Sequence, residues 1–100
     1  MATVFRVEKV RDYTVMSNYH IKDKRISLKA KGLLSQMLSL PETWDYTLSG
    51  LAHINQDGIH AIRNAVRELE EHGYIIRKRA YVDGKLAGAE YTIFEQPQST

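Results

Sequence analysis

The sequence predicts an α+β fold in which three helices precede a two-stranded β-hairpin, with one extra N-terminal strand as an option. Apolar residues recur at spacings of three and four between residues 28 and 72, which is the period of a helix, and alternate with polar residues from residue 74 onward, which is the period of a strand. An Asp-Gly pair divides the alternating segment, as a tight hairpin turn requires. With 100 residues, 43% of them hydrophobic and 26% charged, the chain is expected to form one globular domain.

The N-terminal residues have the composition of an extended arm or strand. Residues 4–16 alternate loosely and include several β-branched and aromatic side chains. If this arm pairs with a sheet edge in a second copy, Phe5 and Val7 are the expected oligomer contacts. We therefore divide the chain into an arm over residues 1–12, a folded domain over residues 13–95, and a polar tail or linker over residues 96–100.

Serine residues mark the starts of the first helical segments. Ser17 is placed to cap a short turn that extends through Ile21, and Ser27 is placed to cap a longer helix that ends before Pro41. Gly32 lies inside this longer helix, where glycine is unfavourable. We therefore expect another backbone to pack closely against it.

A helix-turn-helix pattern follows. Thr47 precedes a short second helix, a turn over residues 55–58 contains a glycine, and a third helix runs from about residue 59 to residue 72 before Gly73. The apolar positions of the third helix, which we expect to face the core, are Ile62, Ala65, Val66 and Leu69.

The rest of the sequence predicts a hairpin around Asp83 and Gly84. A type I′ turn needs two residues that tolerate positive φ, and this pair provides them. With a two-residue loop, the expected cross-strand pairs are Tyr74 with Ile93, Ile76 with Tyr91, and Arg77 with Glu90.

Three helices followed by a hairpin are the pattern of a winged helix-turn-helix domain, which predicts binding to duplex DNA. Rotating by about 200° from the core positions of the third helix gives an outward face of polar side chains that are able to bond base edges. Cations on the hairpin, over residues 77–88, are placed to contact phosphates. The expected DNA-binding residues are Gln56, His60, Arg63, Asn64, Arg67, Arg77, Arg79 and Lys85.

Simpler interpretations of the same features stay open. A polar helix face also suits plain solvation, and a basic hairpin also keeps a sheet edge from aggregating. Because carboxylates oppose phosphate, we interpret Glu68, Glu70 and Glu71 as a solvated face turned away from DNA. The basic stretch over residues 22–31 either contacts flanking phosphates or keeps the first helix soluble.

Composition argues against several other classes of protein. Without cysteine, the chain has no disulfide, thiolate zinc site or cysteine nucleophile. No nucleophile, carboxylate pair, metal-ligand spacing or phosphate loop is recognisable, so we expect no enzyme activity, no metal and no cofactor. No apolar run has the length of a membrane span or the pattern of a secretory signal, so we expect no membrane partner and a cytoplasmic location.

Several segments resemble the winged-helix N-terminal domain of phage and Firmicutes replisome organizers, which are DnaD-related replication-initiation proteins. They are spread over about residues 13–95, and they are Tyr13–Asn18, Ser27–Ser35, Met37–Pro41, Trp44–Tyr46 and Leu51–Ala52. The resemblance implies a winged helix that binds origin or promoter DNA. It also implies the cytoplasm of a bacterium or a phage-infected host, and partners among replication proteins such as a helicase or helicase loader.

Two alternatives accompany this resemblance. Some winged helices of the DnaD type serve chiefly for self-association, which implies an oligomer. The segments 61–63 and 67–74 resemble the helix-to-wing junction of many winged-helix regulators, which implies a transcriptional regulator. Many such regulators have Ser or Thr as the cap of the recognition helix and more polar residues at its start, whereas this chain has Gly58, Ile59 and His60. This departure weakens the expectation of strong base-specific readout.

Overall fold

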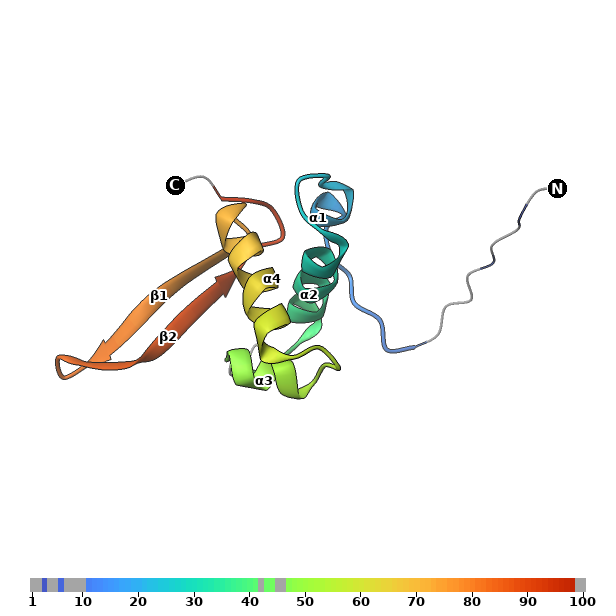
Figure 1. Cartoon of the computed structure of the whole chain (residues 1–100). Coiled ribbons are helices and arrows are strands. Elements are labelled where there is room, and N and C mark those ends of the chain that lie inside the picture. Colours follow the sequence, from blue (N-terminus) through green and yellow to red (C-terminus); the bar gives the residue numbers. More distant parts are fainter. Residues whose placement is uncertain (1–2, 4–5, 7–10, 42, 45–46, 99–100) are drawn as a thin grey trace.

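The computed structural model describes residues 3, 6, 11–41, 43–44 and 47–98, and it is a mixed α and β structure. Helices come first along the chain, and an antiparallel hairpin follows and projects from the helical body (Figure 1). The predicted α+β class is therefore confirmed. The elements are α1 (Tyr19–Lys22), α2 (Leu28–Ser39), α3 (Leu48–His53), α4 (Ile59–Glu71), β1 (Ile75–Val82) and β2 (Lys85–Ile93).

Side-chain caps start two of the helices, and the one at Ser27 is where the sequence predicts it. The Ser27 hydroxyl accepts a hydrogen bond from the amide of Ala30 at 3.1 Å, and the Thr47 hydroxyl accepts one from the amide of Gly50 at 2.8 Å. Each bond satisfies an amide that has no partner inside its helix. Helix α4 instead begins at Gly58, which has no side chain to form such a cap.

The segment ahead of α1 does not form the optional third strand within its described part. Residues 3, 6 and 11–16 belong to no strand, and in Figure 1 the described residues 11–16 extend away from the helices. Phe5 and Val7, the predicted oligomer contacts, lie outside the described residues. The short helical turn predicted after Ser17 is present as α1, but its N-cap is Asn18 rather than Ser17. The hydroxyl of Ser17 accepts a hydrogen bond from the amide of Tyr19 at 3.1 Å.

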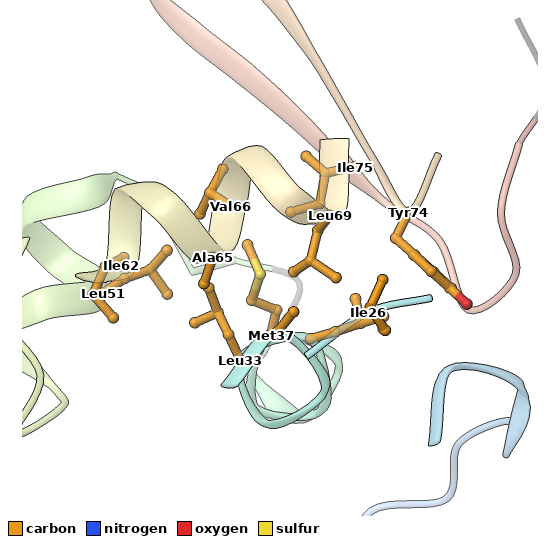
Figure 2. Packing of buried hydrophobic residues seen from close by; sticks show 12 residues of the cluster. Ile26, Leu33, Met37, Leu51, Ile62, Ala65, Val66, Leu69, Tyr74 and Ile75 are labelled. Carbon is orange, nitrogen blue, oxygen red and sulfur yellow. The ribbon is translucent and has the colours of Figure 1, made fainter. Parts of the chain in front are cut away.

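Helices α2 and α4 pack against each other through their apolar faces. Leu33 and Met37 of α2 face Ala65 and Leu69 of α4 across this interface (Figure 2). The buried residues of α4 are the four that the helical period predicts, and Leu51 of α3 closes the core at the other end. Burial of such side chains stabilises a fold by about 1.5–3 kcal/mol each, so this packing fixes the orientation of α4.

Gly32 corrects one expectation. A side chain at this position would meet no described atom within 4 Å, and the residue is exposed. Within the described part of the chain no backbone packs against it, because the contact surface of α2 with α4 lies along Leu33 and Met37 instead.

The hairpin has the predicted turn and a different register. Asp83 and Gly84 both have positive φ, 53° and 76°, and the residues next to them pair as expected, Val82 with Lys85. A bulge between Ala80 and Tyr81 then shifts the pairing by one residue. The three predicted pairs are therefore wrong. Beyond the bulge the observed pairs include Ile75 with Ile93, Ile76 with Thr92, Arg77 with Tyr91, and Lys78 with Glu90.

Tyr74 lies ahead of the hairpin and fastens it to the helices. Its side chain is completely buried, and its hydroxyl donates to a carboxylate oxygen of Asp23 at 2.6 Å. Hydrogen bonds from Arg25 and from Tyr74 hold the pKa of Asp23 well below its usual range. The loop between α1 and α2 is thereby bound to the junction where α4 gives way to β1.

Gly73 makes that junction possible. Its φ of 83° lies in the left-handed region, which favours glycine. An added side-chain carbon would also lie 2.5 Å from the carbonyl oxygen of Gln98, whose amide donates to the Gly73 carbonyl at 2.8 Å. The segment after β2 therefore returns to the end of α4, as Figure 1 shows.

Candidate nucleic-acid interface

Helix α4 turns one apolar face inward and one polar face outward. Because α4 is fixed by its buried face, the positions about half a turn away point to solvent. These positions hold side chains that are rich in hydrogen-bond donors, and all of them are exposed as predicted: His60, Arg63, Asn64 and Arg67.

The two arginines on this face keep their charge available. Neither Arg63 nor Arg67 forms an ion pair within the described residues. A guanidinium that no carboxylate neutralises presents planar, fork-shaped donors to an incoming acceptor. This geometry suits either the edge of a guanine or a phosphate.

A basic strand lies next to the end of α4. Arg77, Lys78 and Arg79 are consecutive in β1 and all exposed, and Lys85 is exposed at the start of β2. The hairpin leaves the helical body directly after α4 (Figure 1), so these cations lie on the element that follows α4 along the chain.

Arg77 differs from its neighbours in having partners. Its Nη2 lies 3.5 Å from Oε1 of Glu70 on α4, and its guanidinium lies 6.0 Å from the centre of the Tyr91 ring on the neighbouring strand. The bulge causes the second contact, because it brings Tyr91 rather than Glu90 opposite Arg77. Arg77 is thus held between α4 and β2.

A small hollow lies between α4 and the hairpin. Its volume is about 80 Å³, and it lies where α3, α4 and β1 meet. The residues that line it include three cations and one acid, and they are Leu48, Arg63, Val66, Arg67, Glu70 and Arg77.

Gln56 lies in the turn between α3 and α4 and is exposed. The residue that fixes this turn is its neighbour Asn55, which sequence reasoning did not single out. The Asn55 amide donates to the Leu51 carbonyl at 2.8 Å and to the Gln36 side chain at 2.6 Å. The turn is therefore held to both α3 and α2, just ahead of the exposed face of α4.

The acidic end of α4 is not the uniformly solvated face that was expected. Glu68 accepts hydrogen bonds from both the amide and the hydroxyl of Ser27, and so fastens α4 to the start of α2. Glu70 contacts Arg77, and Glu71 alone of the three is exposed. The sequence carries no local signal for these contacts, since each partner lies on another element.

His20 is a buried polar residue away from this face. Its Nε2 lies 2.8 Å from the Ser35 hydroxyl, and within the described residues its Nδ1 has no partner. Burial lowers the pKa of His20 below its ordinary value of 6.5. No three histidine or acidic side chains in the described ranges gather closely enough to hold a metal ion.

None of the helices in the described part of the chain has the length and apolar character to cross a membrane. Comparison with known proteins yields no match to a family model, to a curated protein or to a solved structure.

Proposed function

We propose that the chain is a winged-helix domain that binds duplex DNA, with α4 as its recognition helix and the β1–β2 hairpin as its wing. One observation carries the proposal. Helix α4 buries its apolar row against α2 and α3 while Arg63, Asn64 and Arg67 remain exposed beside a strand of consecutive cations. A rigid helix with an accessible polar face is what entry into a major groove requires.

On this proposal, the exposed face of α4 meets the base edges. Arginine pairs with guanine and asparagine with adenine in bidentate geometry, each for about 1–3 kcal/mol of discrimination. His60 lies at the N-terminal end of the same face, and Gln56 lies in the turn before it. Both would meet the groove near the point where α4 enters.

The hairpin supplies contacts that are independent of sequence. Lys78, Arg79 and Lys85 are exposed, and extended cationic side chains of this kind bind phosphate and release counterions. The net charge of the chain is only +2, so its affinity for DNA must come from the local concentration of cations rather than from the total.

Replication initiation is the process that we propose for this binding. The resemblance to DnaD-related replisome organizers supports it and implies a helicase or a helicase loader as partner. Transcriptional regulation is the alternative process, and both use the same protein face on duplex DNA.

Self-association is a second candidate function, and the segment ahead of α1 favours it. Tyr13 and Val15 are 79% and 85% exposed, although both side chains are large and apolar. Such side chains gain free energy when a second surface covers them. A paired chain would also double the number of phosphate contacts, so the two functions are compatible.

The experiment that tests DNA binding is fluorescence anisotropy with a labelled duplex over a salt series. We expect Arg63→Ala and Arg67→Ala each to weaken binding at least about fivefold, because an arginine contact contributes about 1–3 kcal/mol. Lys29→Ala is the matched control, since it removes one exposed cation from α2, where Lys29 lines a different groove. Equal affinities of all three variants would contradict the proposal, provided that circular dichroism shows each to be folded.

A further inference from the structure

The hollow between α4 and the hairpin concentrates positive charge. Arg63 and Arg67 are four residues apart on α4 and therefore lie on one side of it, and Arg77 reaches the same hollow from β1. Glu70, three residues after Arg67, is the one acid among the lining residues. Three guanidiniums against one carboxylate leave an unbalanced positive charge at this point.

The size and lining of the hollow favour a small anion. Its volume of about 80 Å³ is small, which suits one tetrahedral oxyanion better than a nucleobase. Val66, one of the lining residues, is 2% exposed, so part of the wall of the hollow is buried apolar protein. Charges next to such a wall are less screened than charges in open solvent.

The contact between Arg77 and Glu70 is loose. The N–O distance of 3.5 Å exceeds the 2.7–2.9 Å of a charge-assisted hydrogen bond, and the two side chains are 45% and 27% exposed. The ring of Tyr91, meanwhile, supports the Arg77 guanidinium from the strand side. Arg77 is thus positioned at the hollow by Tyr91 and only weakly held by Glu70.

We propose that this hollow is a subsite for a single phosphate of the DNA backbone, bound by Arg77 beside the positive charge of Arg63 and Arg67, and that Glu70 holds Arg77 until the phosphate takes its place. The inference rests on the proposed function and adds an internal competitor to it. Glu70 lowers the affinity for DNA by holding one of its cations in the free protein. Binding then transfers the fork of Arg77 from a carboxylate to a phosphate, for which its geometry is equally suited.

The test compares Glu70→Gln with Glu71→Gln in the full chain. Both substitutions remove one negative charge near the end of α4, but Glu71 is exposed and lines no part of the hollow. We expect Glu70→Gln to bind a labelled duplex about two- to fivefold more tightly than Glu71→Gln, because an exposed ion pair is weak. The slope of log K against log salt should be the same in both variants, because Arg77 contacts a phosphate in either complex, and Arg77→Ala should make it shallower by about one unit.

The Arg77→Ala background shows whether the effect passes through the proposed contact. There, the advantage of Glu70→Gln over Glu71→Gln should disappear. If the advantage persists without Arg77, or if the two variants bind equally while the unmodified chain binds duplex, the inference is overturned and the proposed function stands. A chain that binds no duplex in any form overturns both.

Discussion

His20 is completely buried, and one ring nitrogen lacks a partner within the described residues. Burial is the main cause of its lowered pKa, the cation of Lys31 acts in the same direction, and the carboxylate of Glu95 opposes both. The folded chain therefore binds a proton at His20 less readily than the unfolded chain does. Stability from this residue is complete above pH 6.5 and declines as the pH falls through that value.

We expect acid to destabilise the chain partly through His20. Between pH 8 and pH 5, the free energy of unfolding should fall by up to about 1.4 kcal/mol for each unit by which the pKa is lowered. In His20→Gln this decline should be smaller, because glutamine does not titrate. Urea denaturation at several pH values measures it. His60→Gln, which removes an exposed imidazole, is the control, and identical pH profiles for both variants would refute the role of His20.

The role of Tyr74 in binding the hairpin to the helices does not follow from its residue type. Alternation suggests a strand residue that faces Ile93, yet the Tyr74 amide donates to the Leu69 carbonyl at 2.9 Å and closes the end of α4 instead. The left-handed Gly73 reverses the chain at this point, so Tyr74 turns back to Asp23. Its partner is 51 residues away in sequence, beyond the reach of any local pattern.

At the level of elements, the helices were more predictable than the hairpin. A helical face is set by a local period, so the four core positions of α4 and the caps of α2 and α3 follow from nearby residues. The register of a hairpin depends on every residue between the turn and the pair. One unpaired residue at the Ala80/Tyr81 bulge moved Tyr91 opposite Arg77, although the turn itself was predicted correctly.

The candidate interface likewise has a part that the sequence predicts and a part that depends on the packed fold. Exposure of Arg63 and Arg67 follows from the helical period, so the sequence alone is enough to deduce it. The contact of Arg77 with Glu70 depends on how β1 leaves α4, which is a property of the packed fold. Sequence reasoning therefore found the cations but assigned Glu70, the acid that lies among them, to a solvated face.

The segment ahead of α1 is the element to which self-association would belong. Removal of residues 1–15 takes away exposed Tyr13 and Val15 and, among the described residues of that range, no core residue, so the fold should persist. If this segment joins two copies, we expect the mass from light scattering to fall to that of a monomer. The 100-residue chain that carries both Tyr13→Ser and Val15→Ser is the matched control for length and should behave in the same way. An unchanged mass in both cases would exclude this element from self-association.

Over the whole molecule, the polar face of α4 and the basic hairpin lie on elements that follow each other along the chain (Figure 1). A separate apolar groove between α2 and α4 is lined by Leu28, Lys29 and Ile62, among others, and Leu28 is 84% exposed. The molecule therefore has one face rich in cationic donors and one rich in apolar side chains. We assign duplex DNA to the face that is rich in cationic donors.

Backbone amide shifts during titration with duplex DNA test that assignment most directly. If α4 and the hairpin form the interface, the largest changes should fall at residues 56–67 and 77–85, and they should diminish as salt is added. Residues 28–36, five of which line the groove between α2 and α4, should change little. Dominant changes at residues 28–36 or at residues 11–16, with α4 unaffected, would contradict the account.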